Sequence, residues 1–201
     1  MKYIISILIA VGVFLGLQMV IPTNDEFEIY ENTVRLHVLA NSDTEADQSL
    51  KLKVRDALLE RVNSYGASTK EEAVSQIDEA RNELIEIAEN VVKVNGYDYE
   101  VSIEISQEMY PTRYYEDFAL PAGKYTSVRV IIGEGEGENW WCVLYPPLCT
   151  AAAVSYDEDY CIEAGLTKGQ YNLITENESG EYKIKFRLLE LVQEVFGFKN
   201  D

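Results

Sequence analysis

The chain contains little histidine, little cysteine and few basic residues, and these shortages narrow its range of functions. Its 201 residues include one histidine, three cysteines and 17 lysines or arginines, against 35 aspartates or glutamates. The resulting net charge of −18 argues against binding to nucleic acid, because a polyanion repels so acidic a protein. One histidine and no C-x-x-C pair leave no transition-metal motif, so we expect neither a metal nor a cofactor.

Apolar residues are plentiful by contrast. Hydrophobic residues make up 47% of the chain and aromatic residues 11%, which is enough to fill a core. Length and composition therefore predict one folded domain rather than a disordered chain.

The first 21 residues form the longest apolar stretch. Ile4 to Ile21 contains no charged residue, and as a helix it would be about 27 Å long, close to the thickness of a bilayer core. We interpret residues 1–21 as a signal peptide or an uncleaved signal anchor, and favour the anchor because no small-x-small cleavage site follows. Residues 22–32 would then be an acidic linker, and 33–201 a single extracytoplasmic domain.

Hydrophobic periodicity predicts a sheet with helices. Alternation puts Arg35 and His37 on the face of the first strand opposite its apolar residues, and two capping-box patterns each precede an apolar helical stripe. The predicted elements are strand 33–39, helix 44–65, a helix from the box at 68–71 to Asn95, strands 97–105, 125–132 and 139–145, and helix 182–198. This order predicts an α+β fold, with a mostly antiparallel sheet of about four strands packed against two to three helices, preceded by the N-terminal membrane or signal helix. The last two strands, joined by a Gly-Glu-Gly-Glu-Gly loop, are expected to form a hairpin.

The stretch ENWWCVLYPPLC, residues 138–149, holds both tryptophans of the chain. On a strand, Trp140 and Trp141 point to opposite faces, with Cys142 beside the first and Tyr145 beside the second. Both faces are apolar, so either the strand is covered on both sides or one face is an exposed patch for a protein partner. Tryptophan, tyrosine and arginine dominate binding hot spots, which favours a partner-binding function for this region.

Two further groups of residues are candidates for contact with a partner. Basic residues, including Lys51 and Arg55, lie along the helix at 44–65, where they form either an ordinary solvated face or a patch for an acidic partner. The long connection at 107–123 is rich in aromatic residues, and long loops of this kind are often functional. The candidate partner-binding residues are Trp140, Trp141, Tyr145, Tyr114, Tyr115, Arg35, His37, Lys51 and Arg55.

Cysteine chemistry has several interpretations in this chain. A Cys142 nucleophile would need His37 as its base, and the apolar run around the thiol disfavours a thiolate. We therefore predict no catalytic residues, and keep an extracytoplasmic cysteine-dependent hydrolase using these two residues as the alternative. In an exported protein, Cys142 and Cys149 could instead form a disulfide, or the thiols could remain reduced and buried.

The chain contains the stretches VRLHVLANSDTEADQSLKLKVRDALL and FALPAGKYTSVRVIIGEGEGENWWCVLYPPLC, behind an N-terminal apolar segment. These stretches are similar to the stage II sporulation protein R family. The resemblance extends over residues 33–150, and the Asn-Trp-Trp-Cys-Val-Leu-x-Pro-Pro-Leu-Cys run is its most specific part.

The resemblance implies a sporulation signalling protein rather than an enzyme. Members of that family are made in the forespore and exported across its inner membrane into the intermembrane space. There they activate a membrane-embedded aspartic protease of the mother cell, of the stage II sporulation protein GA type, which removes the pro-sequence of pro-sigma-E. The resemblance therefore implies a protease partner and a location in the intermembrane space, tethered to the membrane or released. A structural envelope domain is a third interpretation.

Overall fold

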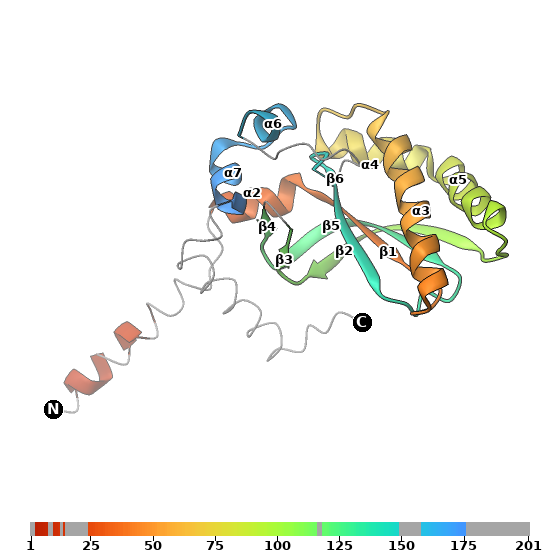
Figure 1. The fold of residues 1–201 in the computed structure, drawn as a ribbon. Helices are drawn as coiled ribbons and strands as arrows, with labels where there is room; N and C mark the ends of the chain where they lie inside the picture. Colours follow the sequence, from red (N-terminus) through yellow and green to blue (C-terminus); the bar gives the residue numbers. More distant parts are fainter. Residues whose placement is uncertain are drawn as a thin grey trace. The chain divides into compact units, whose positions relative to one another are not determined.

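The computed structural model describes residues 3–7, 10–12, 14, 24–115, 118–148 and 158–175 (Figure 1). Within these ranges no helix is both long and apolar enough to span a membrane. The segment interpreted as a signal or anchor is only partly inside the described ranges, and the helix expected at 182–198 is wholly outside them. Within the segment expected as a linker, at 22–32, helix α2 spans Asn24–Asn32 and its Ile29 is buried.

Contacts divide the chain into two compact units, which are described separately. The larger unit comprises residues 30–108 and 124–167, and the smaller comprises residues 1–29, 109–123 and 168–201. The expectation of a single domain from residue 33 onward stays a prediction.

The larger unit is built on a mixed four-stranded sheet. In spatial order its strands are β2 (Val101–Tyr110), β5 (Gly123–Ile132), β1 (Val34–Leu39) and β6 (Asn139–Tyr145). β1 pairs with β5 in parallel and with β6 in antiparallel orientation. The sheet is therefore mixed: the antiparallel pairing that was expected is present between β1 and β6, whereas the central pair, β5 and β1, is parallel.

The hairpin expected between β5 and β6 is wrong, because β1 lies between these two strands. The glycine-rich loop passes across the end of β1 instead of turning back onto β5. Gly133 has a φ of +59°, which glycine adopts without the steric penalty of a side chain. The Gly137 amide donates to the Ala40 carbonyl at 3.0 Å, and Asn41 Oδ1 accepts from the Glu134 amide at 3.1 Å. These bonds attach the loop to the residues that follow β1.

Three helices connect β1 to β2 in the sequence, namely α3 (Glu45–Asn63), α4 (Lys70–Glu79) and α5 (Arg81–Val94). The side-chain oxygens of Thr44 and Thr69 accept hydrogen bonds from the amides of Asp47 and Glu72. Both threonines are therefore N-caps, which satisfy amides that the first helical turn leaves without a partner.

The single helix expected up to Asn95 is divided at Ala80, whose φ and ψ are −87° and 5°. Ile77 before the break and Leu84 after it are both buried. The apolar period thus continues where the helical backbone does not, because periodicity records which side chains are buried and not whether the backbone is continuous.

The helices pack on one face of the sheet and form the main core with it (Figure 1). Val34, Leu36 and Val38 of β1 are buried in this core, as the alternation predicted. Burial of an aliphatic side chain of this size contributes about 1.5–3 kcal/mol, so the shared core dominates the stability of the larger unit.

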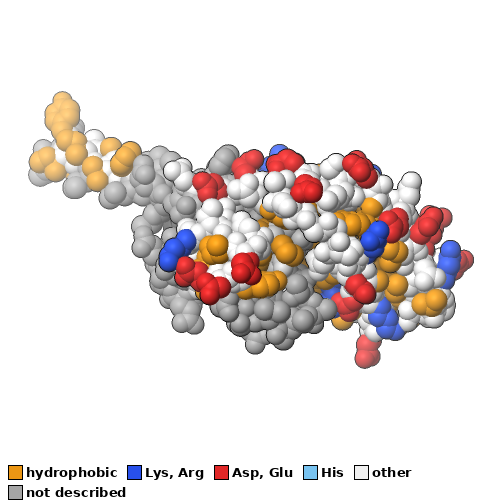
Figure 2. Space-filling model, turned by 90° about the horizontal axis from the view of Figure 1, so that it is seen from above, with side chains coloured by type: hydrophobic (Ala, Val, Ile, Leu, Met, Phe, Trp, Pro, Cys, Tyr) orange, Lys and Arg blue, Asp and Glu red, His pale blue; other side chains and the backbone are white. Residues whose placement is uncertain are grey.

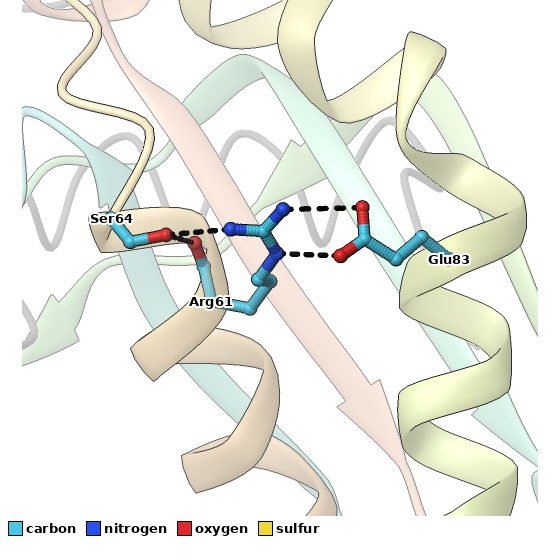
Figure 3. A network of polar contacts seen from close by, with 3 residues as sticks. All are labelled: Arg61, Ser64 and Glu83. Atoms are coloured by element: carbon cyan, nitrogen blue, oxygen red, sulfur yellow. Dashed lines mark hydrogen bonds and ion pairs between the residues drawn. The ribbon is translucent and has the colours of Figure 1, made fainter.

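Figure 3 shows how α3 and α5 are joined at the surface. Arg61 Nε donates to Glu83 Oε1 at 2.7 Å, and its Nη2 donates to Oε2 at 3.3 Å. Arg61 Nη1 also donates to Ser64 Oγ at 3.0 Å. The hydrogen bond to Glu83 raises the pKa of Arg61 above its ordinary value. Because both side chains are exposed, the pair orients the two helices more than it stabilises them.

The smaller unit contains β3 (Arg113–Tyr114), β4 (Ala119–Leu120) and α7 (Lys168–Thr175). β3 and β4 pair in antiparallel orientation, and α7 lies against β4. Phe118, Leu120 and Leu173 are buried. The connection expected at 107–123 therefore contains regular structure in part. Its first residues belong to β2, because this strand continues to Tyr110. A further short helix, α6 (Glu158–Glu163), belongs to the larger unit.

Candidate functional site

The two tryptophans of β6 lie on opposite sides of the sheet. Trp140 is the register partner of Val38, whose side chain points to the helices, and Trp141 is the partner of His37, which points away from them. Because register partners share a face, Trp140 lies on the helix side and Trp141 on the other. The opposite faces predicted from alternation are therefore confirmed.

Trp140 combines with Arg55 of α3 to form a surface group, which we call the Arg55–Trp140 pair. The guanidinium carbon of Arg55 lies 4.2 Å from the centroid of the Trp140 ring, a cation–π geometry. Arg55 Nε and Nη2 also donate to Asp56 Oδ1, at 2.8 and 2.6 Å. The Trp140 side chain remains 37% exposed, so its ring is accessible to a partner.

Trp141 belongs to a polar cluster on the face away from the helices, which we call the sheet-face cluster. The His37 and Trp141 rings are stacked, with centroids 3.9 Å apart and an angle of 15° between the planes. His37 Nδ1 lies 3.4 Å from Glu108 Oε2, and Arg129 Nη1 lies 3.5 Å from Glu108 Oε1. His37 is only 4% exposed, so its imidazole is part of the packed structure rather than an open contact.

The Glu108 carboxylate is held in its charged form within the sheet-face cluster. Burial by itself would raise the pKa of Glu108. Hydrogen bonds with His37 and Ser127, together with the charges of His37 and Arg129, outweigh burial and lower that pKa below its ordinary value. No sequence pattern singles out Glu108 or Arg129, because their proximity depends on how β2, β5 and β1 are ordered in the sheet.

Arg35 and Lys51, both candidates for partner contact, are buried. Arg35 is 0% exposed, and its Nε donates to the Cys142 carbonyl at 3.2 Å. Lys51 is 3% exposed, and its Nζ donates to the Glu138 carbonyl at 2.6 Å and to Gln48 Oε1 at 2.5 Å. Burial, aided by the charge of Arg55, lowers the pKa of Lys51 despite two nearby carboxylates. Arg35 and Lys51 therefore connect β1 and α3 to the main chain at β6, and neither side chain is accessible to a partner.

Tyr145 is buried on the helix side, although alternation grouped it with Trp141. The ladder between β1 and β6 shifts register between Val34 and Arg35, and this irregularity changes the face of the residues beyond it. The Tyr145 hydroxyl donates to the Ser68 carbonyl at 2.8 Å. Burial, followed by the charges of neighbouring glutamates, raises the pKa of Tyr145.

Tyr114 and Tyr115 lie in the smaller unit. Tyr114 is 58% exposed, whereas the Tyr115 ring is stacked on Phe118 with centroids 4.5 Å apart. The Tyr115 amide also donates to the Phe118 carbonyl at 2.7 Å. Of these two tyrosines, Tyr114 is the one with a largely accessible ring.

Cys142 and His37 are not arranged as a nucleophile and its base. Cys142 is buried in the core on the helix side and is disulfide-bonded, whereas His37 lies on the opposite face of the sheet. Cys149, the expected disulfide partner, lies outside the described residues, and Cys161 of α6 is buried. The geometry therefore provides no thiolate–imidazole pair between Cys142 and His37.

The start of α3 holds a second group of polar residues, at a position where the sequence pattern predicted only a helix cap. Asn41 Nδ2 and Ser42 Oγ donate to Asp47 Oδ2 at 2.9 and 2.5 Å. Burial acts to raise the pKa of Asp47, but these hydrogen bonds, with further ones from Tyr99 and Thr44, lower it below its ordinary value. Within the described ranges, no group of three or more histidine, cysteine or acidic side chains could hold a metal ion.

Comparisons with known proteins agree with the resemblance of the two quoted stretches. A family model described as stage II sporulation protein R matches residues 30–155. The stage II sporulation protein R of Bacillus subtilis (strain 168) is 31% identical over 191 residues, which cover 86% of this chain and 85% of that protein. No solved structure matches the chain. The chain therefore belongs to the stage II sporulation protein R family.

Proposed function

We propose that the chain is a sporulation signal that activates a protease in a neighbouring membrane. Membership of the stage II sporulation protein R family gives it a role in sporulation and favours a non-enzymatic one. In this proposal the forespore makes and exports the chain into the intermembrane space, where residues 1–21 act as a signal peptide or anchor. Its partner is the membrane-embedded aspartic protease of the stage II sporulation protein GA type, and the outcome is pro-sigma-E processing.

The observation that supports a direct contact is the Arg55–Trp140 pair. A large ring that is 37% exposed and covered on one side by a guanidinium combines the two residue types that most often dominate binding energy. Arg35, His37, Lys51 and Tyr145 are buried, so the proposed contact on the larger unit is centred on this pair.

Substitution of Trp140 by alanine tests this contact. The ring is partly exposed, so its loss should leave the core intact while weakening protease binding by about 1–2 kcal/mol, or roughly tenfold. Arg55→Ala should give a smaller loss in the same direction, because the cation then no longer covers the ring. The measurements are pro-sigma-E processing in sporulating cells and binding of the purified chain to vesicles that contain the protease.

Two control variants separate a lost contact from a lost fold. Val94→Ala removes another highly exposed apolar side chain and should leave processing unchanged. Trp141→Ala removes the ring stacked on His37 and should lower the melting temperature. Full processing by a folded Trp140→Ala variant would exclude this surface as the contact. A wild-type chain that does not bind the protease vesicles at all would exclude the proposed activation itself.

A further inference from the structure

A groove with a volume of about 720 Å³ lies between α4 and the sheet. One wall is formed by α4, with Glu71, Val74 and Ser75 among its lining residues. The other wall is formed by consecutive residues of β2, from Ile105 to Gln107, together with a residue of β5. None of these residues belongs to the Arg55–Trp140 pair, so the groove is a separate feature of the larger unit.

The β2 wall is the edge of the sheet. Within the described part of the chain, β2 is the terminal strand, paired only with β5. Ile105 packs against the core and Gln107 Nε2 donates to Thr126 Oγ1 at 2.8 Å, whereas Ser106, between them, points to the other face. Because side chains on both faces of β2 border the groove, the free edge of this strand, and not only one of its faces, forms the groove wall. Such an edge directs main-chain N–H and C=O groups outward, where an extended segment can pair with them.

Two of the elements that border the groove, α4 and β2, are acidic over their length, whereas the lining side chains include two acidic ones, Glu71 and Asp78, and two basic ones, Lys70 and Arg81. The ten residues of α4 include four acidic residues and one basic residue, Lys70. The ten residues of β2 include two acidic residues and no basic residue. Lys70 Nζ donates to the Glu31 carbonyl at 2.5 Å, and Arg81 forms an ion pair with Asp78. Glu71 is exposed on the groove wall and takes part in none of the ion pairs of the described residues. A lysine or arginine of a bound segment can therefore pair with Glu71, and the net charge of −18 of the whole chain favours a basic segment over an acidic one.

We propose that the groove binds an extended, basic segment of the partner, which pairs with β2 as an additional strand. The inference rests on the proposed function, because the occupant is an extracytoplasmic segment of the activated membrane protease. Main-chain hydrogen bonds to β2 would fix the orientation of the bound segment. Val74 and Ile105 form an apolar floor that contacts every second side chain of this segment, and Glu71 favours a positively charged one.

Two substitutions test the groove, each with a matched control. Ser75→Trp places a large ring in the groove from the exposed side of α4, and Ser102→Trp places the same ring on an exposed position of β2 that does not line it. Glu71→Lys reverses the charge on the wall, and Glu60→Lys makes the same change on an exposed position of α3. Melting temperatures establish that each variant is folded.

The readouts are binding of the full chain to vesicles that contain the protease and amide hydrogen exchange in residues 104–108. Ser75→Trp and Glu71→Lys should each weaken binding about tenfold, while the two controls bind as the wild type does. Bound protease should slow amide exchange along the β2 edge in the wild type. If Ser75→Trp does not fold, Glu71→Lys and the exchange measurement still decide the outcome.

Each contrary result has a distinct meaning. Unchanged binding by folded groove variants, with weakened binding by Trp140→Ala, overturns the groove and leaves the proposed function intact. Binding without slower exchange at residues 104–108 overturns strand pairing. Absence of wild-type binding to the protease vesicles overturns both the groove and the proposed function.

Discussion

At the scale of single residues, several polar side chains carry hydrogen bonds that hold elements together inside the fold. Asn41 is one example, because its side-chain amide donates to Asp47 at the start of α3 while its oxygen accepts from the loop at Glu134. Arg35 and Lys51 act in the same way, because Arg35 donates to the Cys142 carbonyl in β6 and Lys51 to the Glu138 carbonyl just before that strand. The polar character of these residues therefore does not predict that they are exposed, because their hydrogen-bond partners come from segments distant in the sequence.

Asp47→Asn should destabilise the protein in a pH-dependent way. The folded pKa of Asp47 is below its ordinary value of 3.8, so the stabilisation from its carboxylate is present above that value and is lost as the pH falls through the folded pKa. At neutral pH the variant should lose about 1.5–3 kcal/mol of unfolding free energy, the range for hydrogen bonds to charged groups. Urea denaturation at several pH values measures this loss.

The matched control is Asp98→Asn, at an exposed position that forms no hydrogen bond or ion pair in the described residues. This variant should differ little from the wild type at any pH. The difference in unfolding free energy between the wild type and Asp47→Asn should shrink as the pH falls below about 4. In this range an aspartate in the unfolded chain takes up a proton, and the stabilisation from the native carboxylate is lost. A deficit that is constant across this range would contradict the lowered pKa.

At the scale of elements, the glycine-rich loop decides how β5 and β6 are arranged. An ideal Cβ on Gly137 would lie 2.3 Å from the Ser42 carbonyl oxygen, so only glycine allows the loop to pass this close to the residues after β1. The close passage leaves β6 on the far side of β1, where Trp141 meets His37. The position of β6 therefore depends on the main chain of the glycine-rich loop.

Gly137→Ala should therefore destabilise the larger unit. The added methyl group meets main-chain atoms that cannot rotate away, and overpacking of this kind costs about 1–3 kcal/mol. Denaturant unfolding measures the loss, and hydrogen exchange should show a less protected amide at position 137, which donates to Ala40 in the native protein. Glu136→Ala, at an exposed position in the same loop, should change stability by less than about 0.5 kcal/mol. If the two variants lost equal stability, the close approach of Gly137 to the residues after β1 would not be required for the stability of the larger unit.

At the scale of the whole molecule, acidity dominates. The net charge is −18, and acidic side chains are spread over the described surface in Figure 2 with fewer basic ones among them. Mutual repulsion of these charges opposes the compact state more than the expanded one. A basic surface on a partner would relieve this repulsion, in keeping with the proposed groove occupant.

Added salt should therefore stabilise the protein. Raising the ionic strength from about 0.01 M to 0.15 M shortens the Debye length from about 30 Å to 8 Å and screens the repulsion. The melting temperature should rise by about 2–4 °C over this range, since ΔΔG values near 1 kcal/mol shift a domain of this size by that amount. Sodium chloride and potassium chloride should act alike in a calorimetric scan. A flat or falling melting temperature would show that favourable ion pairs outweigh the net charge.

The sequence by itself determined the α+β class, both capped helix starts, the strands at β1 and β6, and the opposite faces of Trp140 and Trp141. Each of these follows from contacts between near neighbours along the chain, through alternation, helical period and capping. It also determined the family, because the matching stretches are continuous.

Only the tertiary structure decided that β1 lies between β5 and β6, that Arg55 covers Trp140, and that His37 meets Trp141, Glu108 and Arg129 on one face. It also decided that Arg35, Lys51 and Tyr145 are buried, the last because of a register shift in the ladder. These outcomes depend on strand order and register, which are set by packing between segments far apart in the chain. Local periodicity carries no record of that packing, because it reports the face on which a residue lies and not which residue lies opposite.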